Sequence, residues 1–388
     1  MALMQAAGST SMADLFIGLM SGTSLDGVDG VIASFDDAQA RTGGGLQVLA
    51  HASRPFERAF RAELLSLNAR GDDELHRAAL AANALVRHYA EVVHSLLAQA
   101  ALGPRDIRAI GAHGQTVRHR PGLFDGTGYT LQLNQPALLA ELTGIDVVAD
   151  FRSRDVAAGG QGAPLAPFFH RAQFARHPGQ TVGVLNWGGI ANLTLLFDDG
   201  GLTGFDCGPA NALLDAWCLQ HTGQPYDEGG RWAGGGRVVP ALLQRMLAEP
   251  FFALAPPKST GRDLFNMAWL EALLAQSGIL APQDVQATLA ELTVLSSAAA
   301  LRRHGPQVQE LIVCGGGALN EYLLTRLQHH TPKTLVVTSS ERGLPPLQVE
   351  ATAFAWLARA CVLRQPLELP KTTGAQGARV LGAVYPAG

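Results

Sequence analysis

Three glycine clusters, each directly after a run of β-type residues, constrain the fold of this chain most. The first lies within residues 14–35, where an apolar run leads into the turn at 21–27 and then into a second apolar run. The second, within residues 181–199, has the same order. The third follows the apolar run at 310–314 and precedes an amphipathic pattern. The clusters predict two strand–turn–strand hairpins and one strand–turn–helix unit.

The rest of the chain alternates between strand and helix patterns, which predicts an α/β fold with mixed sheets. A hairpin opens each half, and this likeness indicates a structural duplication. The glycine-rich loop at 224–237 is interpreted as a surface element or lid. We expect further strands at 46–52, 107–112, 130–133, 147–151, 202–205 and 334–338, and helices at 57–68, 74–102, 136–143, 209–221, 238–247, 267–277, 282–303 and 347–363.

Composition excludes several classes of protein. The 388 residues, 47% of them hydrophobic and 16% charged, fit two folded domains and exclude a mainly disordered chain. A net charge of −4 gives no indication of nucleic-acid binding. The four cysteines are scattered, which excludes a zinc ribbon and is typical of a reducing compartment. No membrane-length apolar run occurs, so we expect a soluble, cytoplasmic protein in which residues 1–13 form a disordered extension.

The common nucleotide-binding signatures are absent. None of the three lysines follows a glycine, which excludes a Walker-type phosphate loop. No GxGxxG occurs, and the nearest approach to GxSxG, at 22–26, ends in Asp26 rather than glycine. Any phosphate site must therefore use other glycine turns.

The turn at 21–27 exposes backbone N–H groups and short hydroxyls, which suits phosphate oxygens. Asp26 would act there through a cation or as an acceptor that stabilises the turn, and the alternative is an ordinary hairpin turn. The glycines at 315–317 present backbone without side chains, which suits a planar ring such as adenine but also tight packing.

Asp206 ends a strand just before Gly208, Pro209 and Asn211, so its carboxylate lies near a predicted helix N-terminus. It is either a helix cap or a base in a cleft between domains. Asn211 and the helix amides could meet a phosphate from the other side. Together the three glycine turns predict a nucleotide held between two halves.

Polar residues end several strands of the first half, among them His113, Gln115, Arg152 and Asp155. They fit a hydroxyl-rich substrate, and an arginine there could grip a carboxylate with two hydrogen bonds. The alternative is a surface salt-bridge cluster. Glu350 opens the last long helix as a dipole partner or as a second carboxylate of the cleft.

Seven motifs, spread in order over residues 14–385, resemble those of the anhydro-N-acetylmuramic acid kinase family, a branch of the superfamily of actin, sugar kinases and heat-shock chaperone ATPases. The resemblance implies two actin-like (ribonuclease-H-like) domains around a cleft: 14–155, with 366–388 packing back on it, and 156–365. The motifs are GLMSGTSLDGVD, GAHGQTVRHRP, DFRSRDVAAGGQGAPLAP, NWGGIANLT, GFDCGPANALLDAW, CGGGALN and LPPLQVEATAFAWLA.

The family's activity, as the resemblance implies it, uses ATP, Mg²⁺ and water to open 1,6-anhydro-N-acetylmuramic acid and phosphorylate O6 in bacterial peptidoglycan recycling. A homodimer is also implied. The alternatives are another sugar kinase without the hydrolytic step and a non-catalytic ATP-dependent switch. Met20 stands where the superfamily usually has an aspartate. The metal ligands are therefore expected to be Asp26 and Asp206, acting through water.

The resemblance also implies residue roles. Asp206 is the expected catalytic base, and His113, Gln115, Arg152, Asp155 and Glu350 are the expected sugar-binding residues. The expected nucleotide-binding residues are Gly22, Thr23, Ser24, Leu25, Asp26, Gly27, Val28, Asp29, Asn186, Gly188, Gly189, Gly208, Asn211, Gly315, Gly316, Gly317 and Asn320.

Overall fold

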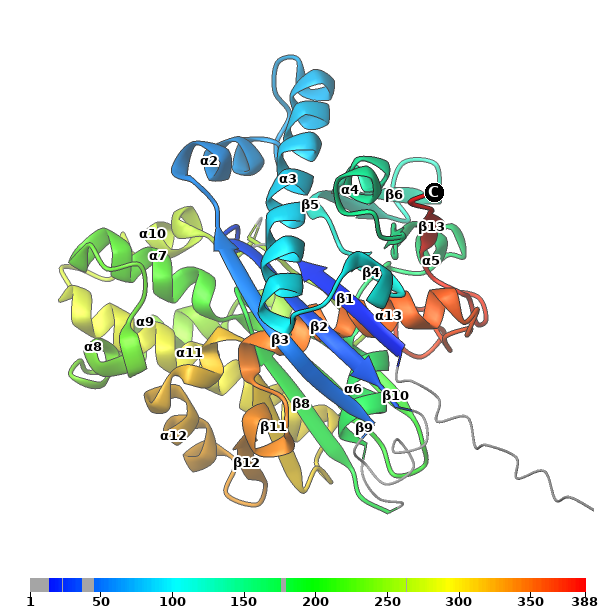
Figure 1. Ribbon diagram of the computed structural model, residues 1–388. Coiled ribbons are helices and arrows are strands. Elements are labelled where there is room, and N and C mark those ends of the chain that lie inside the picture. The colour runs from blue at the N-terminus through cyan, green and yellow to red at the C-terminus, as the bar shows by residue number, and fades with distance from the viewer. Residues whose placement is uncertain (1–13, 23, 37–44, 176–178, 263) are drawn as a thin grey trace, which may run out of the picture.

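The computed structural model describes residues 14–22, 24–36, 45–175, 179–262 and 264–388. The predicted extension at 1–13 and the predicted nucleotide-binding residue Thr23 lie outside the described residues. The chain forms two lobes, each built on one mixed sheet (Figure 1). Within the described residues no helix has the length and apolar character needed to cross a membrane.

The first lobe contains a six-stranded sheet with the order β13-β7-β4-β1-β2-β3. β1 is antiparallel to β2 and parallel to β4, as the first glycine hairpin predicts. The strands are β1 (Asp14–Met20), β2 (Gly27–Phe35), β3 (Leu46–Pro55), β4 (Ala109–Ala112), β7 (Val147–Ala149) and β13 (Ala383–Tyr385).

The second lobe contains a five-stranded sheet with the order β10-β9-β8-β11-β12. Its pairings repeat those of the first sheet, because β8 is antiparallel to β9 and parallel to β11. This repeat confirms the predicted duplication of two α/β halves. The strands are β8 (Val182–Trp187), β9 (Ile190–Leu196), β10 (Leu202–Pro209), β11 (Glu310–Cys314) and β12 (Leu335–Thr338).

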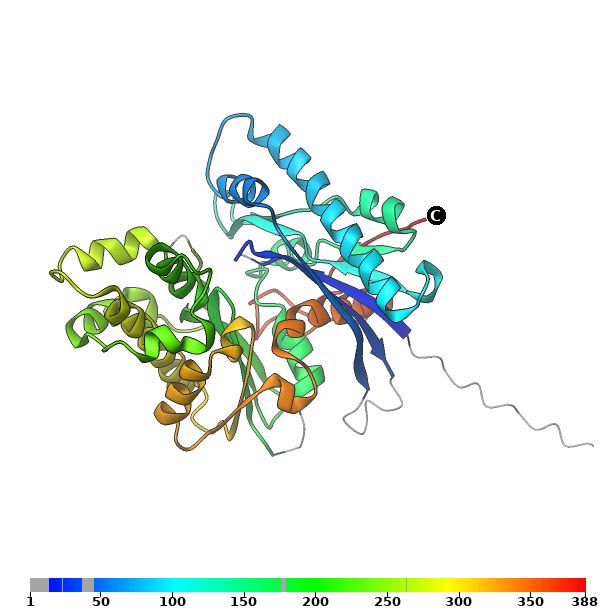
Figure 2. The same cartoon turned by 60° about the vertical axis from the view of Figure 1, so that its left-hand side comes forward.

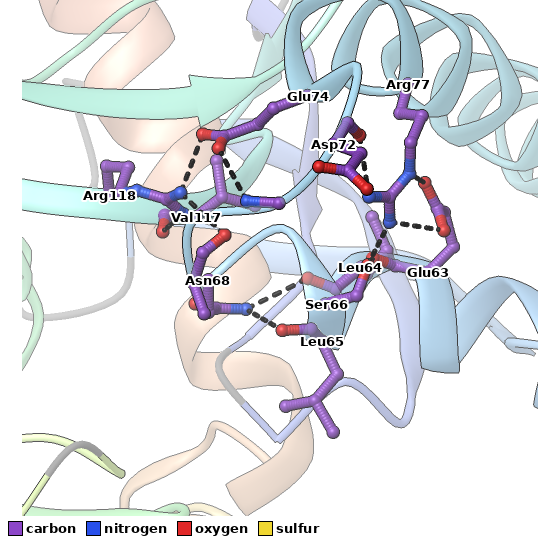
Figure 3. Close-up of polar contacts among 12 residues, drawn as sticks. Glu63, Leu64, Leu65, Ser66, Asn68, Asp72, Glu74, Arg77, Val117 and Arg118 are labelled. Atoms are coloured by element: carbon purple, nitrogen blue, oxygen red, sulfur yellow. Dashed lines mark hydrogen bonds and ion pairs between the residues drawn. The ribbon is translucent and has the colours of Figure 1, made fainter.

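In the first lobe, the long helix α3 (Glu74–Ala100) covers one face of the sheet with a buried stripe that includes Leu85, Tyr89 and Leu96. α2 (Arg58–Ser66) is tied to α3 by a bidentate pair in which Arg77 donates to Glu63 at 2.8 and 2.9 Å (Figure 3). The other elements are the hairpin β5 (Gln115–Pro121) and β6 (Gly128–Leu133), α4 (Pro136–Thr143) and α5 (Ser153–Ala157).

Helices of the second lobe pack around α11 (Pro282–His304), which is buried along most of its length. The loop interpreted as a lid contains two short turns of helix, η2 (Glu228–Gly230) and α8 (Arg231–Gly234). The other helices are α7 (Asn211–Thr222), α9 (Pro240–Leu247), α10 (Met267–Leu274) and α12 (Glu321–His330).

Two helices lie between the sheets. α6 (Ala166–Phe174) packs on the second sheet and α13 (Val349–Val362) packs on β1, β2 and β4 of the first (Figure 2). Gly18 and Gly111 permit the close approach of α13, since a Cβ at either would lie within 2.1 Å of a carbonyl oxygen of that helix. The structure thus places α13 on the first sheet, whereas the sequence boundaries put it in the second half. β13 pairs with β7, so the C-terminal segment also returns to the first lobe.

Candidate active site

A cavity of about 530 Å³ lies between the lobes, and all three glycine turns line it. The turn between β1 and β2 faces the turn between β8 and β9 and the loop after β11 across this space. The predicted residues that line it are Gly22, Ser24, Asp26, Gly27, Asp29, Gly188, Gly189, Asn211, Gly315, Gly316, Asn320 and Glu350.

Local geometry shapes the first turn. The Leu25 amide donates to the Gly22 carbonyl at 3.2 Å, and Leu25 has a positive φ of 58°. A Cβ on Gly27 would lie 2.2 Å from the Arg54 carbonyl oxygen, so only glycine lets β3 approach the turn. Leu25 and Val28 do not line the cavity, because both side chains are buried in the core of the first lobe.

On the opposite side, Gly315 has a φ of 77°, and a Cβ there would lie 2.2 Å from Oδ1 of Asn186. The Asn211 side chain donates to the Trp187 carbonyl at 2.9 Å. Asn320 caps α12 by accepting the Leu323 amide at 3.0 Å. These contacts hold the two turns of the second lobe against each other.

Three predicted nucleotide-binding residues of this lobe do not line the cavity: Asn186, Gly208 and Gly317. Gly208 instead makes room for Phe252, since a Cβ there would lie 2.6 Å from that ring. Gly317 packs against Trp187 in the same way. Asn186 lies behind the cavity and supports a carboxylate that does line it.

That carboxylate belongs to Glu350, whose Oε1 accepts a hydrogen bond from Nδ2 of Asn186 at 3.2 Å. Burial raises the pKa of Glu350, the neighbouring Asp29 raises it further, and Arg152 opposes the shift. Since α13 starts at Val349, Glu350 lies in its first turn, where a carboxylate is also favoured by the helix dipole.

Asp206 lies on β10 beside a bulge, five residues before Asn211, and is not among the residues that line the cavity. Its Oδ2 accepts the Thr260 amide at 2.9 Å, and its own amide donates to the Lys258 carbonyl at 3.2 Å. Burial raises the pKa of Asp206 to about 7. The side chain therefore has the proton affinity of a base that works near neutral pH.

The polar residues predicted at the strand ends of the first lobe form two groups, and none of these four lines the cavity: His113, Gln115, Arg152 and Asp155. The Arg152 guanidinium donates to Nε2 of His113 at 3.2 and 2.9 Å, and to the Gly162 carbonyl at 2.7 Å. Burial, together with Arg152, lowers the pKa of His113 to about 3, so this histidine is a neutral acceptor. Burial also lowers the pKa of Arg152 to about 10.

Gln115 and Asp155 form buried hydrogen bonds that support the first glycine turn and the loop around Gly162, respectively. Gln115 is buried and donates to the Gly22 carbonyl at 3.1 Å, so it supports the first turn. The Asp155 carboxylate has no exposed surface and accepts from the Gly162 amide at 2.6 Å and the Thr373 hydroxyl at 2.5 Å. Asp155 therefore joins the loop after α5, through Gly162, to the segment before β13, through Thr373, and it does not line the cavity.

The cavity also contains side chains that the sequence analysis missed. Asp215 lies one helical turn after Asn211 on α7, so helical spacing could have indicated it. Tyr226, Asp227 and Glu228 come from the loop interpreted as a lid. Arg262 comes from the loop before α10, and no local pattern singles it out.

The donors available to a magnesium ion are carboxylates. Asp26 and Asp29 line the cavity beside the first turn, and they fit a cation that keeps several waters and takes one or two carboxylates plus phosphate oxygens. Asp206 does not line the cavity with them. Among the described residues, no cluster of three or more His, Cys, Asp or Glu side chains could hold a metal by itself.

Comparison with known proteins identifies the family of this chain. The family model described as "Anhydro-N-acetylmuramic acid kinase" matches residues 14–387. The chain belongs to the anhydro-N-acetylmuramic acid kinase family. A family member from Variovorax paradoxus (strain S110) is 62% identical over 379 residues, which cover 96% of this chain and 99% of that one. Another from Albidiferax ferrireducens is 58% identical over 396 residues, covering 97% and 100%.

A solved structure with a similar course of the chain is a ROK family glucokinase from Streptomyces griseus, in complex with glucose and AMPPNP. It is 13% identical, covers 89% of this chain and 99% of that one, and has a TM-score of 0.41. Membership of the anhydro-N-acetylmuramic acid kinase family makes the protein a kinase, a phosphotransferase whose acceptor is an alcohol group.

Proposed function

We propose that this kinase uses ATP to open 1,6-anhydro-N-acetylmuramic acid with water and to phosphorylate O6, releasing ADP and N-acetylmuramic acid 6-phosphate. The observation that carries the proposal is the convergence of three glycine turns from two lobes on one cavity lined by carboxylates. Such a cavity suits a phosphorylated nucleotide on one side and a sugar on the other.

The first chemical step is assigned to Asp206. Its carboxylate takes a proton from water, the water oxygen bonds to the anomeric carbon, and the bond from that carbon to O6 breaks with its electron pair on O6. The Thr260 amide on Oδ2 keeps the carboxylate oriented for this step. The proposal requires the sugar to extend from the cavity to Asp206, which lies on the strand that leads into Asn211.

In the second step O6 bonds to the γ-phosphorus, and the bond to the bridging oxygen breaks so that ADP leaves. Backbone N–H groups of the first turn stabilise charge on the phosphoryl oxygens. When bound, Mg²⁺ would neutralise charge on the phosphates. Asp26, which lines the cavity, is the residue best placed to hold its waters, with Asp206 as the further residue expected from the sequence.

The sugar's own polar groups are assigned to Glu350, Arg152, His113 and Gln115. Glu350 already lines the cavity, and the Arg152 guanidinium lies near enough to affect the pKa of Glu350. An arginine can bind the lactyl carboxylate with two hydrogen bonds. Asp155 contributes to sugar binding only indirectly, because it holds the loop that contains Gly162. We further propose that the enzyme acts in cytoplasmic recycling of peptidoglycan sugars and, as the family resemblance implies, that it works as a homodimer.

The substrate assignment is tested by ADP release in a coupled assay with the anhydro sugar, intact N-acetylmuramic acid and glucose as acceptors. Of these three acceptors, we expect only the anhydro sugar to cause ADP release. Reaction in ¹⁸O-labelled water should place one label at the anomeric carbon of the product. An unlabelled product would identify a sugar kinase without the hydrolytic step, and equal rates with glucose would reject the substrate.

The base is tested with Asp206→Asn, which keeps the shape of the side chain but cannot accept the proton. We expect turnover to fall by ~10²–10⁴-fold, the usual contribution of a general base. Because the pKa of Asp206 is about 7, wild-type kcat should decline as the pH falls below about 7. ATP affinity, measured by calorimetry, should stay near the wild-type value. Near-normal turnover of the variant would remove Asp206 from this role.

A further inference from the structure

The cavity has an unbalanced charge. Six carboxylates line it, whereas Arg262 is the only lysine, arginine or histidine among its described lining residues. A nucleoside triphosphate is a polyanion, so the carboxylates alone repel it and one Mg²⁺ offsets only part of its charge. The single cationic side chain is therefore the group of this chain best suited to a phosphate.

Arg262 reaches across the two lobes. Its guanidinium donates to the Ser24 carbonyl at 3.4 Å, although the two residues are 238 positions apart. Ser24 belongs to the turn assigned above to the phosphates, so the guanidinium lies where those phosphates would be bound. Its Nε is buried and has no hydrogen-bond partner in the described structure. An unpaired buried N–H is costly, and a phosphate oxygen would satisfy it.

The segment that carries Arg262 also holds the proposed base. Thr260, two residues earlier, donates its amide to Asp206, and the Lys258 carbonyl accepts the amide of Asp206. One short segment of the second lobe therefore reaches both reacting centres, the base on one side and the phosphate turn on the other.

We propose that Arg262 is a catalytic residue that binds the γ-phosphoryl group of the nucleotide and stabilises the charge that develops on it during transfer to O6. On nucleotide binding, the guanidinium exchanges the Ser24 carbonyl for phosphate oxygens. This inference rests on the proposed function and adds to it the group that recognises the third phosphate. Arg262 itself makes and breaks no covalent bond during the transfer; it only stabilises charge.

The test compares ATP with ADP, because only ATP carries the γ-phosphate. With Arg262→Gln, calorimetry in the presence of Mg²⁺ should show ATP affinity reduced ~10–100-fold, the range expected for one lost charge-assisted hydrogen bond. ADP affinity should change less than about threefold, since the lost bond is absent from that complex. Turnover with the anhydro sugar should fall by ~10²-fold or more.

Arg61→Gln is the matched control. Arg61 on α2 donates to the same Ser24 carbonyl, at 3.3 Å, but it does not line the cavity. Arg61 also pairs with Asp26 at 3.4 Å, so any loss of affinity in this variant should be equal for ATP and ADP, whereas Arg262→Gln should weaken ATP selectively. Added guanidinium should restore part of the turnover of Arg262→Ala, and a role confined to folding would show no such rescue.

Equal losses of ATP and ADP affinity in Arg262→Gln, or an unchanged ATP affinity, would overturn the assignment. If Arg262→Gln does not fold, Arg262→Lys provides the same comparison, since it keeps one positive charge and loses the planar fork. A wild-type protein that released no ADP with the anhydro sugar would reject the proposed function, and the two affinities would still decide whether Arg262 recognises the third phosphate.

Discussion

Asp215 lines the cavity, and its surroundings there shift the pKa of its carboxyl group. Burial and, to a smaller extent, the neighbouring Asp26 raise the pKa of this carboxyl to about 7, while Arg262 and Arg61 oppose the shift. In the unfolded chain the group titrates near 3.8. Between about pH 4 and 7 the folded state therefore binds a proton that the unfolded state has lost. The contribution of Asp215 to stability must therefore fall across this window as the pH rises, and then level off.

We predict that Asp215→Asn stabilises the protein at pH 8 by ~1–3 kcal/mol, since one pKa unit corresponds to about 1.4 kcal/mol. The gain should nearly vanish at about pH 3, below the unfolded value of 3.8, where the carboxyl is mostly protonated in both states. Urea unfolding at the two pH values measures it. Asp125→Asn is a control of opposite sign, because the Gly128 and Thr127 amides lower the pKa of Asp125. A gain independent of pH would contradict the electrostatic cause.

At this scale the sequence allowed the glycine turns to be placed but not their partners. Gly22, Gly188 and Gly315 are recognisable because a turn depends on a few adjacent residues, which the sequence shows directly. Arg262 is not, since its contact with Ser24 depends on how two lobes meet. Asp206 was expected in the cavity, and the structure places it on the neighbouring strand, not among the lining residues.

At the scale of elements, glycines decide how α13 meets its sheet. A Cβ on Gly111 would lie 2.1 Å from the Phe354 carbonyl oxygen of α13, and backbone cannot yield as a flexible side chain can. α13 also carries Glu350 into the cavity. Displacement of this helix should therefore affect both stability and the site.

We predict that Gly111→Ala lowers the free energy of unfolding by ~1–3 kcal/mol, the usual cost of overpacking, and reduces turnover as well. Chemical denaturation and the ADP assay measure the two effects. Gly103→Ala is the matched control, because a Cβ there would meet only Asp106 at an ordinary 3.6 Å. Wild-type stability in Gly111→Ala would mean that α13 does not pack this closely.

The long helices and apolar strands were predictable because their periodic patterns are local. Several elements were not predicted, among them the short helices α5 and α8, and three others were missed for clear physical reasons. β5 is rich in arginine and histidine, and its buried side chains are Gln115 and Val117, so it lacks the apolar pattern of a strand. α6 is short and begins beside a proline. β13 has only three residues, and its strand conformation depends on antiparallel pairing with β7 at the edge of the sheet.

At the scale of the molecule, the lobes share a core. One cluster of buried residues joins Phe16 and Ala33 of the first sheet to Val184 and Ile312 of the second, through α6 and α13. Neither sheet can bury its inner face without these helices. The two lobes should therefore depend on one another for stability.

We predict a single cooperative transition in calorimetry, with equal calorimetric and van't Hoff enthalpies, despite the duplicated architecture. A nonhydrolysable ATP analogue at 100 times its dissociation constant should shift the whole transition, by ~2.7 kcal/mol of added stability. Two separate transitions, or a shift of one part only, would show that the lobes unfold independently.

The return of α13 and β13 to the first sheet has a consequence for biosynthesis. A ribosome releases the strands from β1 to β7 early, but the helix that covers their inner face and the strand that completes their edge emerge only after the strands of the second lobe. The first sheet of the nascent chain therefore stays partly uncovered until the second lobe has been synthesised, and we expect chaperones to bind this half of the polypeptide.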